Sequence, residues 1–92
     1  MLYHSTKVLL SGILRSLEKT DEIAWDDHIE SGKECLYEMF QMAGPGVTPS
    51  AAMPVCENLA TAIPHVKLML SAIRRQDRAT AVEHGKAAFA AM

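Results

Sequence analysis

The residues best suited to chemistry are carboxylates that recur at the three- and four-residue spacing of a helix. They are Asp26, Asp27, Glu30, Glu34 and Glu38. His28 lies among them, and carboxylates and imidazole at such spacing can bind divalent ions. However, the chain has none of the Glu-x-x-His pairs with which bundles hold two irons. The acids also fall opposite Ile29 and Leu36 on the expected helix. We therefore expect a solvated acidic face, with no metal and no cofactor.

His28 stands four residues before Gly32. This pair resembles the phosphoacceptor region of histidine phosphotransfer domains, which are four-helix bundles with an exposed histidine that accepts a phosphoryl group. The resemblance implies phosphoryl transfer at His28, and it covers only this short stretch. The sequence departs from the family where Ser31 replaces a lysine and Lys33 follows the glycine. The acids around His28 would also repel a phosphoryl group.

The other reactive residue types carry no recognisable catalytic pattern. Cys35 and Cys56 would need an adjacent cation or a helix N-terminus to become nucleophiles, and we expect both to be small apolar residues. His65 and His84 fall near the apolar stripes of neighbouring helices, where we expect hydrogen-bonded boundary residues and not ligands. The chain contains neither Gly-x-Ser-x-Gly nor a glycine-rich phosphate loop. We therefore expect a protein that is not an enzyme.

The composition narrows the class of protein further. The chain has 92 residues and a formal net charge of −2, and 49% of its residues are hydrophobic but only 5% aromatic. Such a length suits one domain over residues 1–92, and near-neutral charge gives no electrostatic footprint for nucleic acid. No apolar run approaches the roughly 18 residues of a membrane span, and the first residues do not resemble a signal peptide. We expect a cytoplasmic protein that binds neither nucleic acid nor membrane.

The elements that must position these residues are helices, because alanine, leucine and methionine are frequent and β-branched residues are few. A first helix is expected over about 5–19. A second begins with an N-cap in 20–22 and stops at Gly44-Pro45-Gly46. A third runs from about Pro54 to Gln76 with a kink at Pro64, and Asp77 caps the last. The sequence thus predicts a small antiparallel four-helix bundle.

Apolar residues at helical spacing predict which side chains form the core. The first helix presents Leu10, Ile13, Leu14 and Leu17. In the third, one helical phase passes straight through Pro64, so the residues expected on the buried face are Val55, Leu59, Val66, Leu70 and Ile73. Glycines 12, 32 and 85 lie inside helices, where each costs about 1 kcal/mol relative to alanine. We expect them to allow close approach of another helix backbone, either within the bundle or across a dimer interface.

Charge is distributed unevenly, and this is the main functional signal. Residues 21–42 carry a net charge of −6, whereas residues 64–92 carry +3. We interpret the protein as an interaction module, either an adaptor, an inhibitor or a regulatory subunit, that uses the acidic face for a partner protein of basic character. An apolar surface of Met39, Phe40 and Met42 could serve instead. The alternatives are a homodimer, which pairs acidic with basic faces, and a bundle that carries a metal, phosphate or small molecule.

Overall fold

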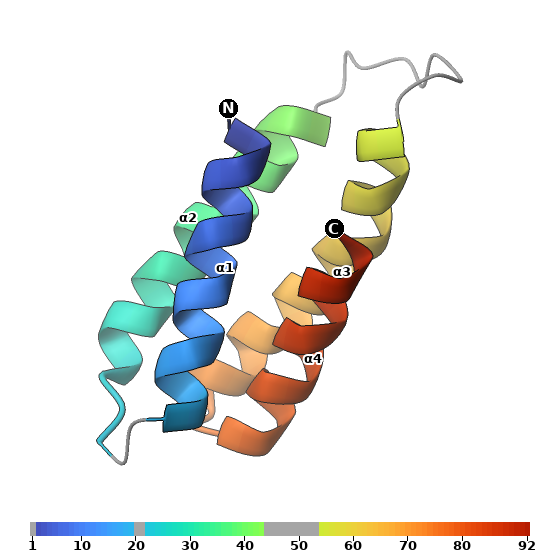
Figure 1. Cartoon of the computed structure of the whole chain (residues 1–92). Coiled ribbons are helices and arrows are strands. Elements are labelled where there is room, and N and C mark those ends of the chain that lie inside the picture. The colour runs from blue at the N-terminus through green and yellow to red at the C-terminus, as the bar shows by residue number, and fades with distance from the viewer. Residues whose placement is uncertain (1, 20–21, 44–53) are drawn as a thin grey trace.

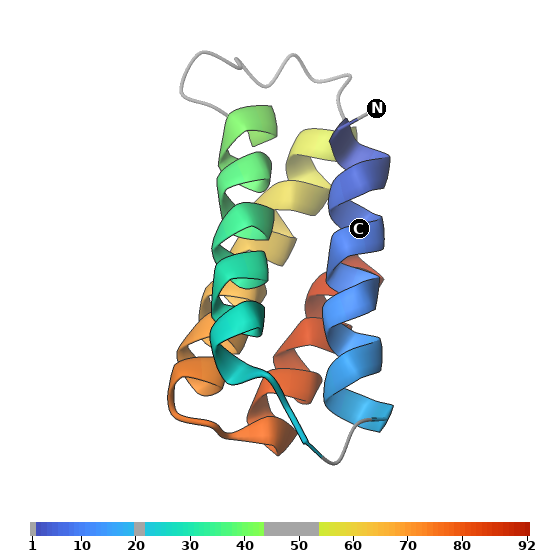
Figure 2. The same ribbon diagram turned by 90° about the vertical axis from the view of Figure 1, so that its left-hand side faces the viewer.

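The computed structural model describes residues 2–19, 22–43 and 54–92 (Figure 1). They form α1 (Leu2–Lys19), α2 (Trp25–Ala43), α3 (Pro54–Arg74) and α4 (Arg78–Ala91). Successive helices run in opposite directions, and each packs against two neighbours, so that α4 closes the ring against α1 (Figure 2). Within the described ranges there is no strand. The expected all-α antiparallel four-helix bundle is confirmed.

The core forms where the apolar stripes of the four helices meet. The predicted stripe of α1 is buried along its whole length. Four of the five residues predicted for the buried face of α3 are buried as well: Leu59, Val66, Leu70 and Ile73. The fifth, Val55, has a side chain outside the described residues. The spacing of apolar residues therefore predicted which face of each of these helices turns inward.

Helix α3 continues through Pro64 without a break. Proline cannot donate the helical hydrogen bond to the carbonyl four residues earlier, which here belongs to Ala60. Both Pro64 and Ala60 are exposed, so water can satisfy that carbonyl. The single long helix is confirmed, and the kink at Pro64 stays a prediction.

The turn between α3 and α4 ends α3 at Arg74, two residues before the expected end. Gln76 has a φ of 57°, which is the left-handed region. The Asp77 N–H donates to the Ala72 carbonyl at 2.8 Å, and the Gln76 N–H donates to the Ile73 carbonyl at 2.9 Å. This is the Schellman arrangement, in which glycine is usual at the left-handed position. Glutamine in that position gave no sequence signal for the turn.

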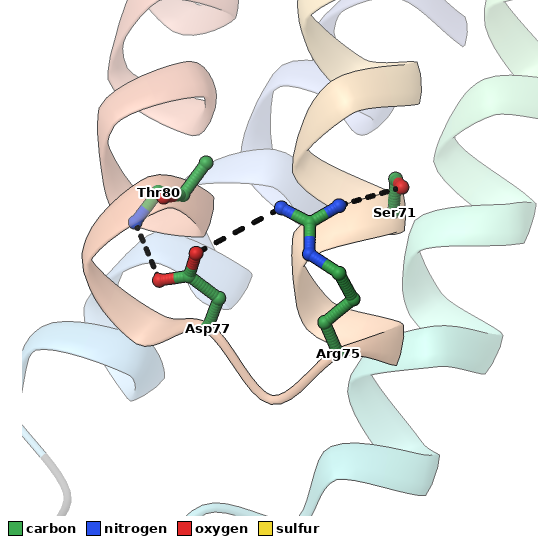
Figure 3. A network of polar contacts seen from close by, with 4 residues as sticks. All are labelled: Ser71, Arg75, Asp77 and Thr80. Atoms are coloured by element: carbon green, nitrogen blue, oxygen red, sulfur yellow. Dashed lines mark hydrogen bonds and ion pairs between the residues drawn. The ribbon is translucent and has the colours of Figure 1, made fainter.

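Asp77 caps α4, as predicted. Its Oδ1 accepts from the Thr80 N–H at 3.2 Å, while Oδ2 lies 3.7 Å from Nη2 of Arg75 (Figure 3). Nη1 of Arg75 donates in turn to the Ser71 hydroxyl at 3.1 Å, so the cap is tied back to the last turns of α3. Hydrogen bonds from Thr80, helped by the charge of Arg75, lower the pKa of the Asp77 carboxyl below its ordinary value of 3.8.

Acid should remove this cap. Because the pKa of Asp77 is lower in the folded state, its stabilising effect is complete above the ordinary pKa of 3.8 and is lost as the pH falls through the folded value. Replacing Asp77 by alanine is therefore expected to lower Tm at pH 7 by more than it does at pH 2. Thermal unfolding of wild type and Asp77→Ala at both pH values measures this difference. An equal loss at the two pH values would contradict the role of the charged cap.

The start of α2 differs from the expectation. Thr20 and Asp21, two of the three residues expected to cap it, lie outside the described residues, and Glu22 precedes the helix. The helix begins at Trp25, where the Ala24 carbonyl accepts from the His28 N–H at 3.1 Å. The expected N-cap region was therefore wrong. Ile23 and Trp25 pack against the core, and this packing explains why the helix starts at Trp25 and not earlier. Asp26 and Asp27 are the acids in the first turn.

Two of the three helical glycines are contact points between helices, as expected. A Cβ on Gly32 would lie 2.9 Å from Cδ1 of Leu70, and one on Gly85 would clash with Cδ2 of Leu14 and lie 3.0 Å from Sδ of Met69. Gly12 is different, because outside its own helix backbone nothing in the described part of the chain lies within 4 Å of the equivalent position. Close approach of a helix within the bundle was therefore wrong for Gly12, and the alternative, a helix across a dimer interface, stays a prediction.

Candidate protein-binding surface

The acidic side chains of α2 form a ridge along the edge that faces α1. Asp27, Ser31, Glu34 and Glu38 follow one another at four-, three- and four-residue steps, which place them on one side of a helix. Asp27 and Glu34 are exposed. We call these four residues the acidic ridge. Glu30 is also exposed, and its Oε1 lies 3.5 Å from Nζ of Lys33. It therefore points away from α1, toward the outer face.

Glu38 anchors the end of the acidic ridge to α1. The expectation placed it on the outer face, but it is half-buried and its Oε1 accepts from the Thr6 hydroxyl at 2.6 Å. Thr6 is fully buried, and burial without a partner would be costly for its hydroxyl. The hydrogen bond therefore fixes the spacing between α1 and α2 at this end of the bundle. Glu38 therefore both holds α2 against α1 and contributes negative charge to the acidic ridge.

A groove of about 350 Å³ lies between α1 and α2, directly beside the acidic ridge. Its lining is mainly apolar on the α1 side and polar on the α2 side: Val8, Leu9, Gly12, Ile13, Ser16, His28 and Ser31. Val8 is 56% exposed, so its apolar side chain is accessible in the groove. Ser31 belongs to both the groove and the ridge. Asp27 and Glu34 are not among the residues that line the groove, but they lie about one helical turn before and after Ser31 on the same side of α2.

Gly12 leaves the middle of this groove open. No side chain covers its Cα, and nothing in the described part of the chain comes within 4 Å of the position that a Cβ would take. Glycine inside a helix is destabilising, and no contact within the bundle requires it here. The bare backbone allows a second helix to approach α1 closely from outside.

The opposite edge of α2 carries the opposite charge. A groove of about 410 Å³ between α2 and α3 is lined by Leu36, Tyr37, Phe40 and Leu70 together with Lys33, Lys67 and Arg74. Nζ of Lys67 lies 5.2 Å from the centroid of the Phe40 ring, a cation–π distance. Among the described residues, no acid lines this groove. Helix α2 therefore lies between this basic groove and the α1/α2 groove, which carries the acidic ridge beside it.

The structure does not bring the three apolar residues of the predicted binding set together. Met39 is fully buried in the core, so its inclusion in an interaction surface was wrong. Phe40 is 45% exposed but lies in the basic α2/α3 groove. Met42 is partly buried and packs against the core. Adjacent helix positions differ by about 100° in direction, which is why Met39 points inward and Phe40 outward.

Asp26 and His28 take separate places at the beginning of α2. Asp26 lines a pocket at the end of the bundle with Ile23, Ala24, Trp25, Asp27 and Gln76. His28 is half-buried and lines the α1/α2 groove. Gly32, the other residue of the phosphotransfer-like pair, is buried against Leu70 of α3. Asp26 therefore lies at the head of α2, away from the long edge that Glu34 and Glu38 occupy.

Cys35 behaves as the expected small apolar residue. It is fully buried, and burial, with smaller effects from the charges of Glu38 and Glu34, raises the pKa of its thiol to about 12. The thiolate, which is the nucleophile, is therefore scarce at neutral pH. The side chain of Cys56 lies outside the described residues.

The sequence-based prediction missed the α1 half of the groove. Val8 and Gly12 gave a signal, since both fall on the side of α1 opposite its predicted stripe, yet only the fold shows that they share a groove with His28 and Ser31 of α2. No protein-family model matches the chain, and no curated protein or solved structure matches it. Across the described helices, none is long and apolar enough to cross a membrane.

Proposed function

We propose that this small helical protein binds a basic amphipathic helix of a partner protein in the groove between α1 and α2. It acts without chemistry of its own, as an adaptor, inhibitor or regulatory subunit in the cytoplasm. The observation that carries this proposal is an open groove that contains the exposed Val8 and the uncovered backbone of Gly12. Ser31 lines its α2 side, and the exposed acids Asp27 and Glu34 lie about one helical turn before and after Ser31 on the same side of α2.

A helix is the occupant that fits the shape and the chemistry. A groove between two helices accepts the apolar face of a third helix, and the missing side chain at Gly12 lets the backbones approach closely. Basic residues flanking the apolar face of the partner would meet Asp27 and Glu34, and such complementary charges steer association and fix orientation. Thus an acidic or neutral helix would lack the ionic contacts that a basic helix gains.

The proposal is tested with a designed peptide and charge reversal. The probe is a helical peptide of about 18 residues, about 27 Å long, with leucines on one face and lysines on the other. Asp27→Lys/Glu34→Lys is expected to weaken binding at least tenfold, because two attractive contacts become repulsive. Binding to wild type should also weaken with salt, since exposed charges are screened over about 8–10 Å near physiological ionic strength. Fluorescence anisotropy of the labelled peptide measures both effects.

A matched variant separates location from net charge. Glu22 and Glu83 are exposed acids outside the acidic ridge, and Glu22→Lys/Glu83→Lys changes the charge by the same amount. It should bind the peptide with nearly wild-type affinity. Equal weakening by the two double variants would show that only overall charge matters, and would refute the assignment of the groove. Far-ultraviolet circular dichroism checks that both variants remain helical.

A further inference from the structure

The structure brings together two histidines that the sequence gave no reason to pair. His65 of α3 and His84 of α4 are both half-buried, and their Nδ1 atoms lie 3.4 Å apart. The ring centroids are 5.6 Å apart and the rings are inclined by 27°. Since the nitrogens are much closer than the centroids, each ring turns its Nδ1 edge toward the other ring.

We propose that His65 and His84 form a Zn²⁺ site that links α3 to α4. Zn–N bonds measure about 2.0–2.1 Å, and two such bonds at a tetrahedral angle place the nitrogens about 3.3–3.4 Å apart. The observed separation of the Nδ1 atoms is 3.4 Å, so both can bind one ion with little rearrangement. Imidazole nitrogen is a preferred ligand of Zn²⁺.

Without the ion, the two rings can share a proton, with one Nδ1–H donating to the other Nδ1. The ion replaces this proton, and both histidines then take the neutral form protonated at Nε2, which leaves each Nδ1 lone pair free. The described residues contain no group of three His, Cys, Asp or Glu that could enclose a metal. The protein thus supplies two ligands, and water completes the coordination.

The composition of α4 explains why such a link would help the fold. The buried residues of α4 are Ala81, Gly85 and Ala88. These are among the smallest side chains, and apolar stabilisation scales with the area removed from water. The fully buried side chains of α4 therefore remove little apolar area from water, while Val82 and Ala91 pack against the core as partly buried residues. An ion bound by one residue on each helix stabilises the folded state because the unfolded chain does not hold the two histidines together.

The test is thermal unfolding of the intact chain with Zn²⁺ alone as the probe. At a free Zn²⁺ concentration about five times Kd, Tm of the wild type is expected to rise by about 4–8 °C, and EDTA should reverse the rise. His65→Gln and His84→Gln should each abolish the rise, because glutamine keeps polarity without the imidazole nitrogen. His28→Gln, on α2, should retain it in full.

Two outcomes would overturn the proposal: no rise in Tm of the wild type at millimolar Zn²⁺, or an equal rise in His65→Gln and His84→Gln. If either variant fails to fold, the ring ¹⁵N resonances of the wild type provide the second measurement. Zn²⁺ should shift the Nδ1 resonances of His65 and His84 and leave those of His4 and His28 in place. Shifts confined to His4 or His28 would refute the site.

Discussion

Gly85→Leu is expected to be strongly destabilising, with a loss of about 1–3 kcal/mol or more in the free energy of unfolding. Its Cβ alone would clash with Cδ2 of Leu14 and lie 3.0 Å from Sδ of Met69, and three further carbons would follow into a buried position. Overpacking of a core costs this much. Urea denaturation monitored by circular dichroism measures the loss. The free energy of unfolding of a small protein is about 5–15 kcal/mol, so a loss of this size should be readily measurable.

Gly85→Ala controls for the size of the side chain. Alanine gains about 1 kcal/mol in helix propensity over glycine, and the atoms that it meets are the ends of the flexible side chains of Leu14 and Met69. Its cost should therefore be smaller than that of leucine. Unchanged stability of Gly85→Leu would mean that α1 and α4 do not approach as closely as the structure has them.

Gly12→Leu is expected to have the opposite pattern: a stable fold and a loss of binding. The position is exposed, and outside the backbone of α1 none of the described residues lies within 4 Å of the added Cβ, so the stability should be unchanged or higher by up to about 1 kcal/mol through helix propensity. The leucine side chain would fill the middle of the α1/α2 groove. Affinity for the basic peptide should fall at least tenfold, which corresponds to about 1.4 kcal/mol. Titration calorimetry measures it.

The same substitution at the two glycines thus distinguishes a packing role from a binding role. A matched surface control is Ala79→Leu, because Ala79 is exposed on α4 and lies outside the groove. It should leave both stability and peptide affinity close to wild type. Full peptide affinity in Gly12→Leu would contradict the proposal that a partner helix crosses α1 at this position.

The fold was largely predictable because helix spacing determines which side chains can be buried together. Leu10 and Leu17 on α1, and Leu59 and Val66 on α3, recur at steps that only a helix aligns. The exact start of α2 was not predictable, because Ala24 carries no capping side chain. The end of α3 was missed for a similar reason, since Gln76 adopts a conformation for which glycine is the usual signal.

The surface was only partly predictable. Spacing alone indicated that Asp27, Glu30 and Glu34 would be exposed, since they lie away from the apolar stripe of α2. Which of them would flank a groove depends on where α1 packs, and the sequence of α2 carries no information on its neighbour. The pairing of His65 with His84 likewise depends on how α3 and α4 are aligned. The contacts between helices therefore determine which residues form the groove and the histidine pair, and the spacing of residues within one helix does not reveal these contacts.

The most direct test of the proposed function is a map of the peptide contacts on the protein. Titrating the ¹⁵N-labelled chain with the basic peptide, followed by ¹H–¹⁵N correlation spectra, shows which backbone amides change. If the peptide binds in the α1/α2 groove, the largest shifts are expected at the amides of Val8, Gly12, Ser31 and Glu34, with little change along the α2/α3 groove at Phe40 and Lys67. Largest shifts along the α2/α3 groove, or shifts spread evenly over all exposed acids, would contradict it.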